Sequence, residues 1–359
     1  MSLAKLRIDN IRNIRQAKLN PGPLANIIFG DNGSGKTSLL EAIQILASGK
    51  SFRTSHLRSI INHDAEFLRV VGEVVTPQRH VPIGIERGLG HTAVKIAGTR
   101  VNGVSELAFL LPVQYLGPES HRILELGPRF RRQLIDWGVF HVEQVYYSLW
   151  RKMQKLLKQR NAALRDKKHK ETIAAWDKDL VDTAEQLTRH RHQYIDLLIP
   201  LFNEYVAQLS PGLQVTCCFA QGWSEQMSYQ EVLKDAFERD RSKGVTMYGP
   251  HRADLVFRMA GVNAREELSR GQQKAVIMAL RLAQVALLKQ RSGRNCVILV
   301  DDLPSELDQA HQRRVLELLS DFNTQTFITS IHSETLQDVV EGAETKKFHV
   351  EHGVVKEVV

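Results

Sequence analysis

A glycine-rich loop near the N-terminus constrains the fold more than any other feature of the sequence. Residues 30–37 read GDNGSGKT, which matches the pattern GxxxxGK[ST], and they lie between an apolar run at 24–30 and a helical pattern at 38–49. In such a loop, backbone N–H groups wrap around phosphate oxygens. The strand–loop–helix order therefore predicts an α/β fold with a phosphate site; the alternative is a glycine-rich turn without a ligand.

The residue types in this loop predict a nucleotide and a metal. Its members are Gly30, Asp31, Asn32, Gly33, Ser34, Gly35, Lys36 and Thr37. Lys36 offers a positive charge to the β- and γ-phosphates of ATP, and Thr37 offers a hydroxyl ligand to Mg²⁺. The helix that follows adds the positive end of its dipole.

A second motif lies far along the chain, with its Asp301 265 residues after Lys36. The run CVILVDD at 296–302 is an apolar strand that ends in two carboxylates. A buried strand parallel to the loop strand would place Asp301 near Mg²⁺ and Asp302 where it can orient an attacking water. One of the two carboxylates could instead cap a turn or helix.

The pentapeptide LSRGQ opens a long helical pattern at 271–289. It resembles the LSGGQ signature of ABC-type ATPases, with Ser269, Arg270, Gly271 and Gln272 in the signature positions. This resemblance implies that the signature of one subunit closes over the nucleotide of a second subunit. A serine at a helix start also acts as an N-cap, which is the alternative for Ser269.

Three further positions match the ABC pattern. Gln114 precedes the helical region, as the glutamine of a Q-loop would, and Asp308 follows Asp301 at the spacing of a D-loop. His332 follows the strand pattern TFITSI and corresponds to the switch histidine, although a solvated loop histidine is the alternative. The resemblance implies that Gln114 and His332 sense the γ-phosphate and that Asp308 lies at a dimer seam.

The middle of the chain is helical. From about residue 129 the sequence is nearly free of Gly and Pro, and Leu180, Leu187, Tyr194 and Leu201 recur at a spacing of seven. This periodicity predicts two long helices in an antiparallel hairpin, joined by a charged turn at 166–172.

The predicted fold class is an ABC-type (P-loop) ATPase head with an antiparallel β subdomain and an inserted helical lobe. Short strand patterns over residues 67–116 supply the β subdomain. The predicted segments are an N-terminal ATPase half (1–127), a helical insertion (128–244) and a C-terminal ATPase half (245–359).

The spacing of the motifs separates this chain from other ABC-type proteins. Transporter subunits have a more compact core and a membrane partner, and SMC proteins insert hundreds of coiled-coil residues. The short insertion resembles the RecF family, and several runs match that family. These runs are Arg12–Asn13, FGDNGSGKTSLLEAI (29–43), FRRQLIDWGVF (130–140), LKQRNAALR (157–165), YGPHRADL (248–255) and DDLPSELD (301–308).

The RecF resemblance implies a bacterial, cytoplasmic and nucleoid-associated protein without a membrane partner. It implies an ATP-dependent homodimer that clamps DNA, duplex or single-stranded, at gaps and junctions. RecR and RecO would act with it to load RecA in gap repair, replication restart and the SOS response. The alternative is a nucleotide-gated adaptor that binds proteins and contacts DNA incidentally. The role of His251 and Arg252 in the YGPHRADL run stays open.

The charge of the chain fits an anionic partner. Forty-eight Lys and Arg stand against 40 Asp and Glu, a net charge of +8, and nine of the residues in 151–170 are Lys or Arg. Such a stretch suits phosphate contacts, although a solvated helix face is the alternative. The DNA-binding candidates are Arg151, Lys152, Lys155, Lys158, Arg160, Arg165, Lys167 and Lys168.

Overall fold

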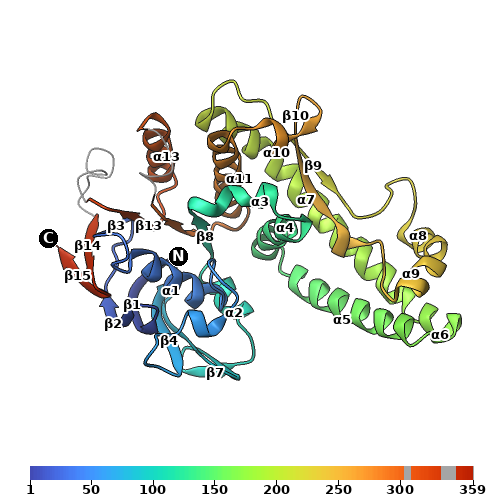
Figure 1. The fold of residues 1–359 in the computed structure, drawn as a ribbon, viewed down its shortest axis with the longest axis horizontal. Helices are drawn as coiled ribbons and strands as arrows, with labels where there is room; N and C mark the ends of the chain where they lie inside the picture. The colour runs from blue at the N-terminus through green and yellow to red at the C-terminus, as the bar shows by residue number, and fades with distance from the viewer. Residues whose placement is uncertain (303–308, 333–344, 359) are drawn as a thin grey trace. The chain divides into compact units, whose positions relative to one another are not determined.

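The computed structural model describes residues 1–302, 309–332 and 345–358, and Figure 1 shows their fold. The chain divides into two compact units. The first unit comprises Met1–Ser120 and Leu288–Val359, and the second comprises His121–Leu287. The first unit is therefore assembled from both ends of the chain.

An antiparallel sheet forms one layer of the first unit. In spatial order its strands are β2 (Ile14–Leu19), β1 (Ser2–Ile11), β4 (Phe67–Val75), β5 (His80–Gly88), β6 (His91–Ile96) and β7 (Thr99–Val101). Strand β1 buries Leu3, Leu6 and Ile8, while Lys5 and Arg7 between them are exposed. This alternation is what a sheet with one buried face requires.

The second sheet is mainly parallel and contains both motif strands. In spatial order its strands are β15 (Val354–Val358), β14 (Lys346–Glu351), β3 (Ala25–Phe29), β13 (Thr326–Ser330), β12 (Val297–Val300) and β8 (Val113–Leu116). All neighbours pair in parallel except β15, which is antiparallel to β14. Strand β13 lies between β3 and β12, and every residue of β12 and β13 is buried. The glycine-rich loop and Asp301 therefore follow parallel strands at the same edge of one sheet, as predicted.

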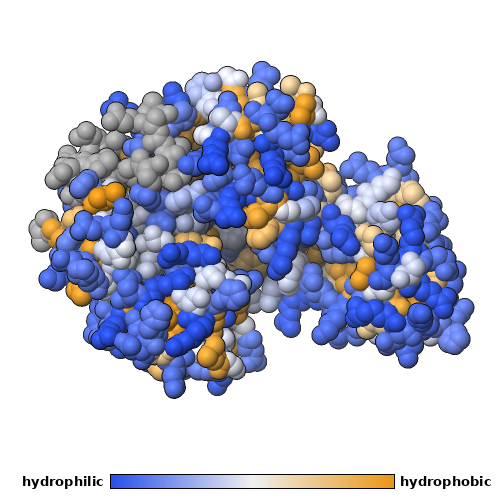
Figure 2. Space-filling model, viewed as in Figure 1, coloured by the Kyte–Doolittle hydropathy of each residue, from blue (hydrophilic) through white to orange (hydrophobic). Residues whose placement is uncertain are grey.

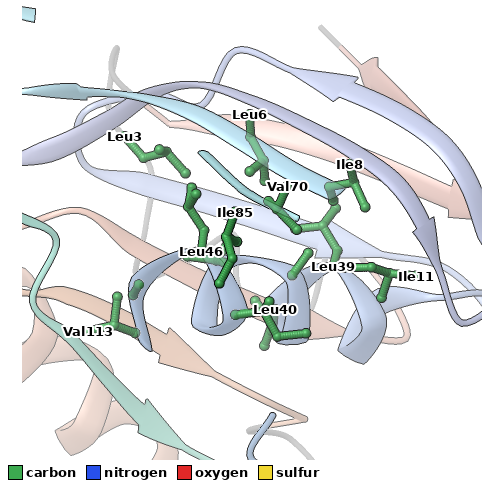
Figure 3. Close-up of a cluster of buried hydrophobic side chains, with 14 of the residues drawn as sticks. Leu3, Leu6, Ile8, Ile11, Leu39, Leu40, Leu46, Val70, Ile85 and Val113 are labelled. Carbon is green, nitrogen blue, oxygen red and sulfur yellow. The ribbon is translucent and has the colours of Figure 1, made fainter. Parts of the chain in front are cut away.

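Helix α1 (Lys36–Ser48) packs between the two sheets, and this explains why it is buried on nearly all sides. Figure 3 shows Leu39 and Leu46 of this helix directed toward the strands that carry Ile8 and Val70, with Val113 of β8 on the other side. Other described helical segments of this unit are η1 (Leu57–Ser59), α2 (Ser105–Leu110) and α13 (Gln309–Asp321). The apolar core thus anchors the helix that begins at Lys36.

Helices dominate the second unit. They are α3 (Arg122–Glu125), α4 (Pro128–Val142), α5 (Tyr146–Arg165), α6 (Lys170–Ala174), α7 (Asp177–Leu209), α8 (Tyr229–Asp235), α9 (Phe237–Lys243), α10 (Ala264–Glu267) and most of α11 (Arg270–Ser292). A small antiparallel sheet joins β9 (Thr216–Ala220), β10 (Asp254–Met259) and β11 (Val262–Asn263). The short segment η3 (Pro250–Arg252) also lies in this unit, and η2 (Pro118–His121) spans the boundary between the two units.

The predicted helical hairpin is present. Helices α5 and α7 pack side by side, and Leu180, Leu187 and Tyr194 are buried (Figure 1). The predicted turn at 166–172 overlaps the short helix α6, which covers Lys170–Ala174.

The two units differ from the three predicted segments. Residues 245–287 belong to the second unit, whereas the sequence placed them in a C-terminal ATPase half. The reason is local packing: β10 pairs with β9, and Arg131 of α4 binds Asp254 through two hydrogen bonds of 2.8 and 2.9 Å. The predicted boundary at 127 also moves, to Ser120.

Hydrophilic residues predominate on the face shown in Figure 2, and hydrophobic residues form small, separate areas there. Among the helices in the described ranges, none is long and apolar enough to cross a membrane.

Candidate nucleotide-binding site

The glycine-rich loop is held in place by the two ends of the chain. Asn13 Nδ2 donates to the carbonyl oxygens of Gly33 and Ser34 at 3.2 and 2.8 Å, and Gly353 N–H donates to Ser34 O at 2.8 Å. Gly30 has a φ of 144°, and a Cβ atom there would lie 2.2 Å from Val350 O. Glycine is therefore required at this position by both its dihedral angle and its surroundings.

Lys36 is folded into the loop that precedes it. Its Nζ donates to Gly30 O at 2.6 Å and to Asp31 O at 3.0 Å. Burial lowers the pKa of Lys36, and the charges of Asp302, Asp301 and Asp31 oppose that shift. The ammonium group of Lys36 and these three carboxylates thus belong to one electrostatic cluster.

Asp301 joins three elements at this site. Its Oδ1 accepts hydrogen bonds from Thr37 Oγ1 at 3.0 Å and from Thr329 Oγ1 at 2.8 Å, and its Oδ2 accepts one from Tyr115 Oη at 3.2 Å. Burial raises the pKa of Asp301, while the three hydroxyl bonds lower it. The carboxylate lies beside the loop hydroxyl, as the paired motifs predict.

Asp302 is fixed by its backbone. Its φ is 54°, and its N–H donates to Thr329 Oγ1 at 2.7 Å. A single threonine of β13 therefore holds both aspartates, through the side chain of the first and the backbone of the second.

The site fits Mg²⁺ bound together with a phosphate. Thr37 and Asp301 are a hydroxyl and a carboxylate at contact distance, which are ligands that Mg²⁺ accepts. No group of three His, Cys, Asp or Glu residues in the described part of the chain could hold a metal alone. Ser34 Oγ is buried and lacks a hydrogen-bond partner among the described residues, which suits an additional acceptor such as a phosphate oxygen.

Two residues that sequence reasoning did not assign, Tyr115 and Thr329, contact Asp301. The predicted Gln114 lies inside β8 with 2% of its surface exposed, and its neighbour Tyr115 reaches the carboxylate. Strand alternation explains this difference, because adjacent side chains point to opposite faces. The sequence signal for these two residues is that each strand beside β12 carries a hydroxyl side chain: Tyr115 on β8 and Thr329 on β13.

Of the other two predicted positions, the structure describes His332 but not Asp308. His332 is exposed and directly follows Ile331, whose carbonyl accepts a hydrogen bond from Gly30 N–H at 3.3 Å. His332 is therefore the neighbour in sequence of a residue that contacts the glycine-rich loop. Asp308 lies outside the described residues.

The signature residues lie in the second unit, at the start of α11. Ser269 Oγ accepts a hydrogen bond from Gln272 N–H at 3.3 Å, and Gln272 Oε1 accepts one from Ser269 N–H at 3.0 Å. This reciprocal pair is a capping box, so Ser269 does act as an N-cap. Ser269, Arg270 and Gly271 are also exposed, which leaves them accessible to a second subunit.

The prediction that Arg160 binds DNA is wrong. Its side chain is fully buried, and it donates to Asp177 at 2.9 Å, Asp240 at 2.7 Å and Thr246 at 2.8 Å. It lies on the face of α5 that packs into the unit and cannot contact a phosphate. The other seven candidates, Arg151, Lys152, Lys155, Lys158, Arg165, Lys167 and Lys168, are exposed.

The YGPHRADL run comprises η3 and the start of β10, and arginines hold it in place. Arg191 donates to Pro250 O at 2.7 Å, and Arg132 donates to Ala253 O at 2.6 Å. The imidazole of His251 bonds Thr246 O at 2.9 Å, and burial lowers its pKa to about 4. His251 is therefore a neutral, structural residue at neutral pH, whereas Arg252 is exposed.

Known proteins resemble the chain over its whole length. A family model described as the RecF/RecN/SMC N-terminal domain matches residues 2–356. A DNA replication and repair protein RecF from Shewanella piezotolerans is 42% identical over 356 residues, which cover 99% of each chain. A RecF from Shewanella frigidimarina has the same identity and coverage.

Solved structures resemble it as well. The recombination mediator protein RecF with ATP, described as part of the RecFOR pathway, has a TM-score of 0.88 and 25% identity, covering 99% of this chain and 97% of that one. An SMC head bound to the C-winged helix domain of ScpA has a TM-score of 0.60 at 17% identity, covers 100% of this chain and 97% of that one, and shows the fold alone. The predicted ATPase-head fold class is confirmed.

Proposed function

Because the chain belongs to the RecF family of DNA replication and repair proteins, we propose that it is an ATP-dependent, DNA-binding recombination mediator. The observation that carries the proposal is the contact between Thr37 and Asp301 at 3.0 Å. It joins the phosphate loop to the acidic strand across most of the sequence, in a head of the type that binds ATP in a solved RecF structure.

The proposed chemistry is slow hydrolysis of ATP to ADP and phosphate. Lys36 and the loop backbone hold the phosphates, while Thr37 and Asp301 hold Mg²⁺, which neutralises phosphate charge when bound. Asp302 orients the attacking water and His332 responds to the γ-phosphate, whereas Gln114 is buried on the strand face opposite Tyr115. The side chain of Asp302 is one methylene shorter than that of a glutamate in the same position. We therefore expect slow ATP turnover, which suits a switch.

The nucleotide acts as a dimer clamp. Ser269 and its exposed neighbours bind the ATP held by a second subunit, at the start of a helix whose dipole favours anions. Hydrolysis then separates the dimer and releases DNA.

DNA at gaps and at junctions of single and double strands is the proposed substrate. The exposed cations of α5 and of the segment after it support phosphate contacts, which give affinity without sequence specificity. We infer that in this role the chain works with RecR and RecO in the bacterial cytoplasm to load RecA. A solved structure that resembles it is a recombination mediator protein RecF of the RecFOR pathway. The outcome is gap repair, replication restart and the SOS response.

A salt series tests this function against a protein-binding adaptor. Binding of the purified chain to a gapped duplex is measured with ATP and Mg²⁺, and Lys36→Met serves as the matched variant without nucleotide binding. We expect log affinity to fall with log salt by about 0.9 for each phosphate neutralised, and we expect weak binding of the variant. A slope near zero would instead favour the adaptor.

A further inference from the structure

One face of α5 carries cations along its whole length. The helix contains no acidic residue, and its buried side comprises Tyr146, Met153, Leu156, Leu157, Arg160 and Leu164. The exposed side carries Arg151, Lys155, Lys158 and Arg165. At 3.6 residues per turn these four lie within about 80° of one another around the helix axis.

The four cations have no acidic partner among the described residues. Lys152, at the margin of the face, differs because it bonds Asp179 of α7 at 3.1 Å. The face extends over ~27 Å between residues 147 and 165, about eight phosphate spacings of one duplex strand. It can therefore follow a nucleic-acid backbone over several nucleotides.

Aromatic rings stand at the N-terminal end of this face. The rings of Tyr147 and Trp150 are nearly parallel, at an angle of 8° with centroids 6.5 Å apart. Phe140 of α4 contacts Tyr147 edge-on at 5.7 Å, and Arg151 Cζ lies 5.9 Å from the centre of the Tyr147 ring. Tyr147 and Trp150 are only half-buried, so part of each ring is accessible.

Tyr146, the residue before Tyr147, has a different role: its ring is buried in the unit, whereas the ring of Tyr147 is partly exposed. Tyr146 is 1% exposed and bonds Asp136 at 2.5 Å and Arg191 at 2.9 Å. Tyr147, one residue later, points to the cationic face and has no such network among its described contacts. Packing of the unit explains Tyr146 but leaves the exposed area of Tyr147 and Trp150 unexplained.

Aromatic rings beside a cationic track are the combination that binds unpaired strands. Base stacking on an aromatic side chain contributes ~1–3 kcal/mol, and Lys and Arg follow the phosphates. In a duplex the bases are already stacked on each other, so their faces are covered. The rings therefore distinguish single-stranded from double-stranded nucleic acid.

We propose that this face of α5 binds single-stranded DNA, with Tyr147 and Trp150 stacking on unpaired bases and Arg151, Lys155 and Lys158 contacting phosphates. The proposal rests on the DNA-binding function above and adds a site that recognises the unpaired side of a gap or junction.

Two binding measurements in the presence of ATP and Mg²⁺ test this site. One uses labelled oligo(dT) of about 20 nucleotides, and the other uses a blunt duplex of equal length. We expect Tyr147→Ala combined with Trp150→Ala to weaken oligo(dT) binding by about 10- to 100-fold and to change duplex binding less than about twofold. The control pair Tyr147→Phe and Trp150→Phe keeps the rings and should bind within about threefold of the parent chain.

Melting temperature and ATP binding, measured on each variant, show that the fold is intact. Lys155→Gln with Lys158→Gln should lower the salt slope for oligo(dT) by about 1.4, at ~0.7 for each phosphate contact. Unchanged oligo(dT) binding by a folded Ala pair would overturn the proposal, and so would an equal loss for the duplex. If the parent chain bound the duplex but not oligo(dT), this site alone would be wrong; if it bound neither, the DNA-binding function would fail.

Discussion

Asp301 and Thr329 connect the fold to the proposed chemistry at the scale of single residues. Asp301 receives hydroxyl hydrogen bonds from the loop, from β8 and from β13, and Thr329 is fully buried between the two aspartates. A buried carboxylate is tolerated when it is hydrogen-bonded, and these bonds also fix its direction. The same bonds that stabilise the folded chain therefore orient the proposed Mg²⁺ ligand.

Thr329→Val tests this arrangement. The change removes the donor to Asp301 and the acceptor for Asp302 N–H while conserving side-chain shape, so we expect a loss of about 1–3 kcal/mol in unfolding free energy. ATP turnover should fall more than ATP binding, because the base loses its support. Thr326→Val on the same strand serves as the control, because among the described residues its hydroxyl bonds only Thr324 O. Equal effects of both changes on turnover would argue against a special role for Thr329.

His251 gives a prediction about pH. The imidazole stays neutral in the folded chain down to a pKa of about 4, whereas an unfolded histidine takes up a proton near its ordinary value of 6.5. Its contribution to stability is therefore present above pH 6.5 and is lost as the pH falls toward 4. Between pH 7 and pH 4.5 the parent chain should lose ~2–3 kcal/mol more than His251→Gln, measured by urea unfolding. Parallel losses would show that His251 titrates normally.

At the scale of elements, α5 divides its basic residues between two tasks. Arg160 ties the helix to Asp177 at the start of α7 and to Asp240 of α9, whereas Lys158 two residues earlier is exposed. Composition alone cannot separate these residues, because both belong to the same basic run. Their helical positions can separate them: Arg160 lies on the side of Met153, Leu156 and Leu164.

Arg160→Met should therefore destabilise the chain far more than Lys158→Met. Removing the guanidinium leaves the fully buried Asp240 unpaired, which costs about 3–5 kcal/mol in unfolding free energy. The exposed lysine should change stability by less than about 0.5 kcal/mol while lowering DNA affinity. Chemical denaturation together with DNA titration measures both quantities. A small effect of Arg160→Met on unfolding would contradict the structural assignment.

Much of the fold was predictable because its signals are periodic. The alternation in β1, the helical spacing in α7 and the continuous apolar run before Asp301 each follow from burial geometry. The boundary between the units was not predictable, since it depends on pairing of β10 with β9 and on the Arg131–Asp254 ion pair. The contacts of Tyr115, Thr329 and Asn13 with the site also depend on which strands become neighbours.

At the scale of the whole molecule, the two ends of the chain build one unit and the middle builds the other. The phosphate loop and Asp301 lie in the first unit, and the exposed signature lies in the second. This division suits a dimer in which each subunit contributes a different surface to the nucleotide. The proposed function therefore depends on nucleotide-dependent association of two subunits.

Light scattering with and without ATP and Mg²⁺ measures this association most directly. The parent chain should form dimers only with ATP, and Lys36→Met should stay monomeric because it cannot hold the phosphates. Ser269→Arg should bind ATP nearly as well as the parent chain but should not dimerise, since its bulk and charge obstruct the seam. ATP-dependent dimers of Ser269→Arg, or a parent chain that stays monomeric with ATP bound, would contradict the account.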